Sequence, residues 1–192
     1  YGFDFKKKFG QNFLIDENVV EKIVREAGVT KDDFVVEVGP GIGTMTQILC
    51  ENAREVVAVE IDKKLIPILT EDTLSYYDNV TVINEDILKL DIKRLADEKN
   101  DGRPIKVVAN LPYYITTPIV MKFLEEDIPV TDIVVMVQKE VADRLIAIPG
   151  EKNTGAITYA VYYYSIAEKI LEVPKESFIP EPEVTSEVIK LN

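Results

Sequence analysis

Short apolar segments alternate with amphipathic ones along most of this 192-residue chain, and the alternation limits the folds open to it. The apolar segments have the length of buried strands and lie at residues 34–38, 55–59, 80–83, 106–109 and 132–137. A segment with helical periodicity follows each of them, ending near residues 52, 75, 98, 125 and 147. Repeated strand–helix order predicts an α/β fold whose mostly parallel sheet is covered by helices on both faces.

The two ends of the chain depart from this order. Residues 17–27 have the pattern of an amphipathic helix, with Asp16 as its N-cap and Gly28 at its C-terminal end. We interpret the apolar and aromatic segment 156–165 as strand packing, rather than as an array of base-stacking tyrosines. Residues 170–173 and 184–191 predict a strand pair that closes the sheet and includes an antiparallel member. Because there is no repeat or linker, residues 1–192 are expected to form one domain.

The composition limits the kinds of functional site that the chain can form. With no His and a single Cys, a zinc site is disfavoured and imidazole catalysis is excluded. Cys50 is expected to be a buried small apolar residue in a reducing cytosol. No apolar segment has the length of a membrane span, and no signal peptide is visible, although the chain starts at Tyr1 rather than Met. The net charge of −12 argues against nonspecific nucleic-acid affinity, and Lys6, Lys7 and Lys8 are the clearest basic cluster.

A glycine loop follows the first expected strand, in the segment Glu37-Val-Gly-Pro-Gly-Ile-Gly43. A dinucleotide-binding loop needs glycine at its first, third and sixth positions, but the sixth position here is Thr44. The spacing matches the Glu/Asp-x-Gly-x-Gly-x-Gly loop of S-adenosylmethionine-dependent methyltransferases. The next two strands end at carboxylates that could bind a nucleoside: Glu60 the ribose hydroxyls and Asp86 the adenine amino group. Ile61 and Ile87 could then cover the two faces of the adenine.

The segment Asn110-Leu111-Pro112-Tyr113 lies directly after the fourth expected strand. An amide oxygen and a free backbone carbonyl can hold the two N–H bonds of an adenine amino group, while a ring stacked on the base fixes its plane. Without support elsewhere in the chain, an ordinary turn that ends a strand would be the favoured interpretation of this segment.

Several segments together resemble the small-subunit ribosomal RNA adenine N6,N6-dimethyltransferases of the KsgA type, along essentially the whole chain. They are Lys7-Lys-Phe-Gly-Gln-Asn-Phe-Leu-Ile-Asp16, Glu37 to Thr46, Asn110-Leu-Pro-Tyr-Tyr-Ile115, Gln138-Lys-Glu-Val-Ala-Asp-Arg144 with Pro149-Gly150, and Phe178-Ile-Pro-Glu-Pro-Glu-Val-Thr-Ser186. The resemblance implies a Rossmann-like class I S-adenosylmethionine-dependent methyltransferase fold, with a mostly parallel seven-stranded sheet and one antiparallel strand. Residues 1–30 would be a cofactor- and RNA-binding segment with its helix, and residues 34–192 the sheet core.

The resemblance also implies roles for individual residues. The methionine end of the cofactor would be lined by Gln11, Asn12 and Leu14, and its cradle formed by Glu37, Gly39 and Gly41. Asn110 would contact the cofactor as well as the acceptor. Glu60 would hold the ribose, and Asp86 the adenine. Asn110 and the Leu111 carbonyl, in the turn set by Pro112, would bind the acceptor amino group. Tyr113 would stack on the acceptor base, with Tyr114 as a wall residue. Phe178 would cover the other face, although a core ring in a Pro-rich loop is an equal alternative from the sequence alone.

The implied reaction moves methyl groups from S-adenosylmethionine to two adjacent adenines near the 3′ end of small-subunit RNA, leaving S-adenosylhomocysteine. We expect a cytoplasmic monomer without metal that acts on an immature small subunit, with Lys6, Lys7 and Lys8 contacting RNA. Members of this family carry a helical C-terminal domain, and this chain is expected to lack it because it stops at Asn192. The alternatives are the large-subunit methyltransferase of macrolide resistance, a non-catalytic ribosome-assembly factor and, less favoured, a DNA adenine methyltransferase or a nicotinamide dehydrogenase.

Overall fold

The computed structural model of the protein describes residues 12–192. Its main sheet has seven strands in the order β4-β3-β2-β5-β6-β9-β7, and β9 alone runs antiparallel to its neighbours. The strands are β2 (Phe34–Val38), β3 (Glu55–Glu60), β4 (Val80–Asn84), β5 (Ile105–Asn110), β6 (Val130–Gln138), β7 (Ala167–Val173) and β9 (Ser186–Leu191). The predicted seven-stranded, mostly parallel sheet with one antiparallel strand is therefore confirmed.

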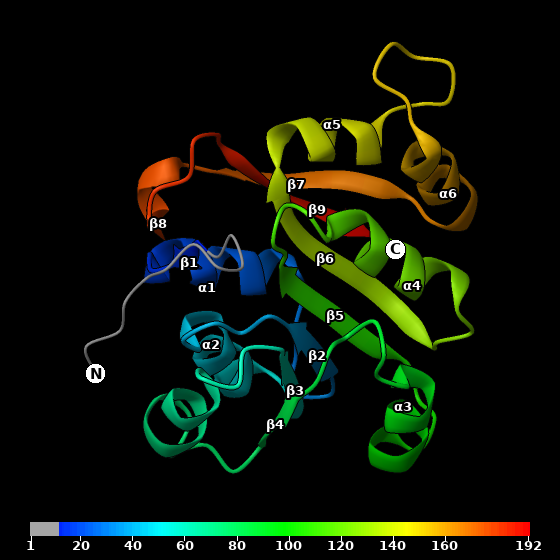
Figure 1. Ribbon diagram of the computed structural model, residues 1–192. Coiled ribbons are helices and arrows are strands. Elements are labelled where there is room, and N and C mark those ends of the chain that lie inside the picture. The colour runs from blue at the N-terminus through cyan, green and yellow to red at the C-terminus, as the bar shows by residue number, and fades with distance from the viewer. Residues whose placement is uncertain (1–11) are drawn as a thin grey trace.

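Helices cover both faces of this sheet (Figure 1). They are α1 (Glu17–Glu26), α2 (Thr44–Asn52), α3 (Ile92–Asn100), α4 (Thr116–Glu125), α5 (Lys139–Ile146) and α6 (Ala156–Tyr164). The expected helix of residues 62–75 is a π-helix, η2 (Ile68–Thr73), in its central part. The predicted N-cap of α1 is confirmed, because Asp16 Oδ1 accepts hydrogen bonds from the amides of Asn18 and Val19 at 3.1 and 3.3 Å.

Alternating side chains of the strands separate two apolar layers. On one face, Val36 and Val107 pack with apolar residues of α3 to α6. On the other face, Val35 and Val108 pack with α1 and α2, where Cys50 is buried as predicted. Since side chains two apart in a strand share a face, Glu37 and Asn110 both project to the side of α1 and α2.

The interpretation of residues 156–165 as strand packing is wrong, because these residues form helix α6. Ile157 and Val161, four residues apart, are buried where α6 packs against α4 and α5, whereas Tyr159, Tyr162, Tyr163 and Tyr164 are all more than half exposed. The helix starts where the Thr158 hydroxyl accepts from the Gly155 amide at 3.0 Å and donates to the Arg144 carbonyl at 2.8 Å. High strand propensity is thus overridden by a buried face with helical spacing.

A second, two-stranded sheet joins the two ends of the chain. Strand β1 (Phe13–Leu14) pairs antiparallel with β8 (Phe178–Ile179), which follows the 3-10 helix η3 (Lys175–Ser177). In this pairing Leu14 lies opposite Phe178. The sheet places the segment before α1 beside the Pro-rich loop near the C-terminus (Figure 1).

Candidate active site

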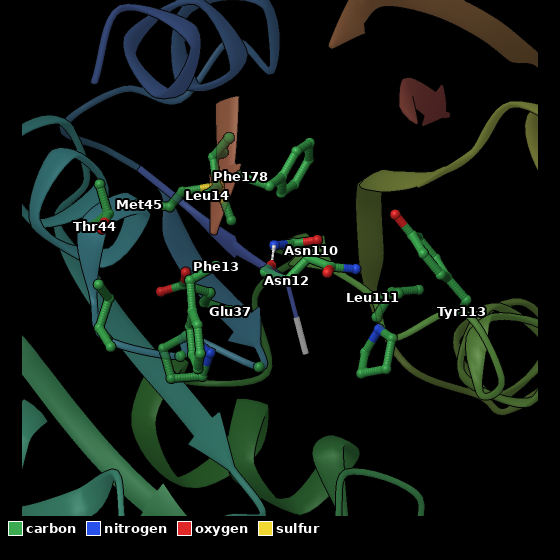
Figure 2. Close-up of a pocket in the computed structure, with 15 residues that line it drawn as sticks. Asn12, Phe13, Leu14, Glu37, Thr44, Met45, Asn110, Leu111, Tyr113 and Phe178 are labelled. Atoms are coloured by element: carbon green, nitrogen blue, oxygen red, sulfur yellow. Dashed lines mark hydrogen bonds between the residues drawn. The ribbon is translucent and has the colours of Figure 1, made fainter. Parts of the chain in front are cut away.

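One pocket at the carboxyl edge of the main sheet joins the glycine loop after β2 to the turn after β5. The two strands are neighbours, so both segments emerge side by side. The lining residues are Asn12, Phe13, Leu14, Glu37, Gly39, Pro40, Gly41, Ile42, Thr44, Met45, Asn110, Leu111, Pro112, Tyr113 and Phe178 (Figure 2). Ligands of open α/β sheets bind at this edge. The two motifs identified separately in the sequence therefore face one cavity.

The glycine loop has a backbone that other residues adopt only with strain. Gly39, Gly41 and Gly43 have φ angles of 69°, 61° and 91°. A Cβ on Gly41 would lie 2.9 Å from Phe13 Cδ1, so the loop also needs the missing side chain for close packing. The Gly41 amide donates to Glu60 Oε2 at 3.2 Å, and the Asp62 amide donates to Glu60 Oε1 at 2.8 Å. Buried Glu60 thus holds the loop in shape, and burial raises its pKa.

Glu37 is a buried acidic residue that lines the pocket. Its side chain is 1% exposed, and neither carboxylate oxygen has a hydrogen-bond partner among the described residues. The Thr46 hydroxyl is near enough to lower the pKa of Glu37, but it does not reach hydrogen-bond geometry. Burial dominates and raises the pKa of Glu37 to about 8. A buried carboxylate without a partner is costly, so a cation or a hydrogen-bond donor bound in this pocket would stabilise its ionised form.

Asn110, at the end of β5, is oriented by the N-terminal segment. Its Nδ2 donates to the Asn12 carbonyl at 3.3 Å, as the dashed line in Figure 2 marks. Because the N–H side of the amide is engaged there, Oδ1 is left to accept hydrogen bonds in the pocket. The β1–β8 sheet fixes the segment that carries Asn12. An acceptor group of the site therefore depends on contacts between residues from opposite ends of the sequence.

The turn after Asn110 leaves one carbonyl available. The Pro112 carbonyl accepts from the Ile115 amide at 3.1 Å and from the Thr116 hydroxyl at 3.3 Å. The Leu111 carbonyl has no donor within residues 12–192, whereas the Leu111 amide donates to the Met136 carbonyl. Asn110 Oδ1 and the Leu111 carbonyl are thus two hydrogen-bond acceptors in one short turn. This pair suits a group with two N–H donors.

Aromatic side chains border the turn. Tyr113 and Phe178 both line the pocket, and Figure 2 shows them on different sides of Asn110. Phe178 is 3% exposed and also packs into the core layer under α1 and α2, so the two alternatives from the sequence are compatible. Tyr114, interpreted as a wall residue, is 66% exposed and lies outside the pocket lining. That interpretation is therefore corrected.

Other predicted positions lie apart from the pocket lining. Ile61 is half exposed, while Ile87 is buried in the layer of α3 to α6. The Asp86 carboxylate accepts from the Leu88 amide at 3.0 Å. These residues follow β3 and β4, beside the glycine loop, and their nucleoside-binding role stays a prediction. Gln11, Lys6, Lys7 and Lys8 lie outside the described residues.

Several lining residues were not predicted from the sequence. Phe13 lies inside the N-terminal motif, and Ile42, Thr44 and Met45 continue directly from the glycine loop. These residues could have been predicted as pocket residues because they lie next to the motifs in the sequence. Within residues 12–192, no group of three or more His, Cys, Asp or Glu side chains is placed to hold a metal ion. The helices of the same part of the chain are all too short or too polar to span a bilayer.

We predict that Gly41→Ala lowers both protein stability and cofactor affinity. The substituted residue must keep a positive φ, and its new methyl group must displace the Phe13 ring. The loss of unfolding free energy should therefore exceed the roughly 1 kcal/mol of backbone strain alone. Gly28→Ala measures that strain by itself, since Gly28 has a similar φ of 66° and an added Cβ would lie no closer than 3.9 Å to another atom. Gly155→Ala, at an extended φ of −149°, should be nearly neutral. Denaturant unfolding of the three variants checks the order, and equal losses for Gly41 and Gly28 would contradict it.

Comparisons with known proteins identify the family that this chain resembles. The family model described as "Ribosomal RNA adenine dimethylase" matches residues 2–192. The Ribosomal RNA small subunit methyltransferase A of Lachnoclostridium phytofermentans is 65% identical over 100% of this chain and 66% of its own length. A dimethyladenosine transferase from Plasmodium falciparum superposes with TM-score 0.80 at 29% identity, over 93% of this chain and 62% of that one. The 23S rRNA methyltransferase ErmE superposes with TM-score 0.81 at 30% identity, over 94% of this chain and 69% of that one.

These likenesses confirm the predicted class I methyltransferase fold. The chain spans about two thirds of the length of the curated relatives that it matches. The alignment covers the glycine loop, the Asn110 turn and the Phe178 segment together. This chain belongs to the ribosomal RNA adenine dimethylase family.

Proposed function

We propose that this chain catalyses methyl transfer from S-adenosylmethionine to N6 of two adjacent adenines near the 3′ end of small-subunit ribosomal RNA. The product would be N6,N6-dimethyladenosine, formed during ribosome biogenesis. One observation carries the proposal: the glycine loop with Glu37 and the Asn110 turn with Phe178 line the same pocket. A methyl donor and an adenine amino group bound to these two motifs would meet in it.

The residues present fit S-adenosylmethionine. When bound, this cofactor supplies an electrophilic methyl group on a positively charged sulfonium. Glu37 offers a buried carboxylate, which has no hydrogen-bond partner within residues 12–192, to a ligand that also carries an ammonium group. Gly39 and Gly41 let the ligand approach the backbone closely. The Phe13 ring lies close to Gly41, so it borders the backbone that the ligand would approach.

The acceptor side holds the adenine amino group. Asn110 Oδ1 and the Leu111 carbonyl accept its two N–H bonds, which draws the nitrogen toward a pyramidal geometry and aims its lone pair at the methyl donor. Tyr113 and Phe178 would border the base on two sides. A protein base is not required, because an N-methylated ammonium product is acidic enough to lose its proton to water. This suits a chain without His. A second transfer needs room for one methyl group at the same nitrogen.

The partner is small-subunit RNA in an immature ribosomal subunit. A net charge of −12 is unfavourable for binding naked RNA, so recognition would rely on a local basic face and on a preassembled particle. Lys6, Lys7 and Lys8 are proposed to contribute to that face. We propose a cytoplasmic protein that acts as a monomer, without a metal ion.

Labelled S-adenosylmethionine and undermethylated small subunits test this function. We expect label on two adjacent adenines near the 3′ end of the small-subunit RNA, mapped by primer extension and mass spectrometry. Label on large-subunit RNA would instead support an activity like that of the 23S rRNA methyltransferase ErmE. Calorimetry that detects no cofactor binding would support a non-catalytic assembly factor on the same fold.

A further inference from the structure

The edge strand β4 ends at an asparagine whose side chain reaches the neighbouring strand. Asn84 is the last residue of β4 and lies opposite Glu60 in the parallel pairing of β4 with β3 (Figure 1). Its Nδ2 donates to the Glu60 carbonyl at 2.7 Å and to the Ile61 carbonyl at 3.3 Å. The Glu60 carbonyl also accepts from the Glu85 amide at 3.2 Å. Two donors from the end of β4 therefore hold the backbone at the point where β3 ends.

Glu60 connects this backbone contact to the glycine loop. Its buried carboxylate accepts from the Gly41 amide at 3.2 Å and from the Asp62 amide at 2.8 Å. Glu60 is thus held at its carbonyl by β4, while its carboxylate holds the loop that follows β2. Hydrogen bonds weaken steeply outside a narrow range of distance and angle. A shift of the Glu60 backbone would therefore release Gly41, whose backbone has a positive φ and lines the pocket.

A second asparagine makes the same kind of contact at the opposite end of β4. Asn79 directly precedes the strand, and its Nδ2 donates to the carbonyls of Cys50, Ala53 and Arg54 at 2.9, 3.2 and 3.4 Å. These carbonyls come before β3, so they lie at the opposite edge of the sheet from the pocket. Asn79 and Asn84 both tie β4 to segments next to β3, but only Asn84 does so at the edge where ligands of parallel sheets bind.

We propose that Asn84 is a positioning residue for the cofactor. By fixing the Glu60 backbone, it keeps the Glu60 carboxylate where the Gly41 amide can donate to it, and so maintains the binding shape of the glycine loop. The inference rests on the proposed function, in which this loop cradles S-adenosylmethionine. It assigns Asn84 to cofactor affinity rather than to the methyl-transfer step, because its contacts lead to the glycine loop.

Asn84→Ala and Asn79→Ala form a matched pair, since each removes hydrogen bonds from a side-chain amide to backbone carbonyls. Asn84→Ala should raise the Kd for S-adenosylhomocysteine, measured by calorimetry, about five- to tenfold. Its single-turnover transfer rate with saturating S-adenosylmethionine should stay within about twofold of wild type. Asn79→Ala should lower the melting temperature at least as much, but its Kd should stay within about twofold of wild type. Asn84→Leu, which is similar in size and has no donor, should behave as Asn84→Ala.

A double variant tests the route through Glu60. Glu60→Gln removes one of the two carboxylate acceptors and should itself weaken cofactor binding. Adding Asn84→Ala to it should then raise the Kd much less than in wild type, because contacts in one chain of hydrogen bonds are not additive. Fully additive losses would overturn the inference. So would a wild-type Kd in Asn84→Ala, or equal increases of Kd in Asn79→Ala and Asn84→Ala.

Methyl transfer to small subunits distinguishes this inference from the proposed function. If wild type binds S-adenosylhomocysteine but transfers no methyl group to small subunits, the proposed function fails, and the Kd values of the variants still decide the role of Asn84. If wild type does not bind S-adenosylhomocysteine, both proposals fail.

Discussion

Replacing Asn110 by alanine is expected to slow methyl transfer at least about a hundredfold, a larger effect than its effect on cofactor affinity. Asn110 Oδ1 is one of two acceptors for the adenine amino group, and its amide is held in place by the Asn12 carbonyl. Removing it leaves the amino group bound only at the Leu111 carbonyl, so the lone pair is no longer aimed. Single-turnover transfer with saturating cofactor measures the rate, and calorimetry measures the affinity.

Two further variants sharpen this experiment. Asn110→Asp keeps acceptor oxygens but cannot donate to the Asn12 carbonyl, so its rate should lie below that of wild type if the orientation of the amide matters. Asn153→Ala changes an exposed asparagine in the loop between α5 and α6 and should behave as wild type. Transfer by Asn110→Ala at the wild-type rate would show that the acceptor amino group is held elsewhere.

Replacing Glu37 by glutamine is expected to weaken cofactor binding about ten- to a hundredfold, the worth of a hydrogen bond to a charged group. The carboxylate is buried and has no partner among the described residues, so a cationic ligand would supply its only close opposite charge. Glutamine keeps the shape but loses the charge. Isothermal titration measures the change, and Glu85→Gln, at an exposed position after β4, is the control. Unchanged affinity in Glu37→Gln would exclude Glu37 from the cofactor site.

The raised pKa of Glu37 also predicts a pH dependence. Below about pH 8 the empty protein holds this side chain protonated, and binding a cation must release the proton. Cofactor affinity should therefore fall by up to about tenfold per pH unit as pH drops below about 8. In Glu37→Gln, cofactor affinity should lose the pH dependence caused by Glu37. Any pH dependence that remains comes from other groups or from the cofactor. An identical pH profile in both proteins would contradict the assignment.

The folding stability of the empty protein should change with pH in the opposite sense to cofactor affinity. The folded pKa of Glu37 lies above its unfolded value, so folding favours the protonated form. Stability should fall as pH rises from about 4.5 to about 8, by on the order of a few kcal/mol. Glu37→Gln stays neutral and should be more stable than wild type above that window. Urea unfolding across this pH range checks the prediction, and a less stable variant at pH 8.5 would contradict it.

Local sequence patterns were sufficient for the main sheet and for the two motifs of the site. The spacing of apolar residues that predicts strands and helices, and the glycines and prolines that end them, can be recognised from neighbouring residues alone. The same holds for the side of the sheet on which Glu37 and Asn110 lie, because each shares its face with the valine two residues earlier. Helix α6 shows where this reasoning fails, since its tyrosines favour a strand and only its packing against α4 and α5 selects a helix.

By itself, then, the sequence determined which strand ends carry the glycine loop and the Asn110 turn, because both are short-range patterns. The tertiary structure alone decided how the site is completed. The pairing of β1 with β8 and the hydrogen bond from Asn110 to the Asn12 carbonyl both join residues far apart in the chain. Such contacts form only when the sheet closes, so no local pattern encodes them.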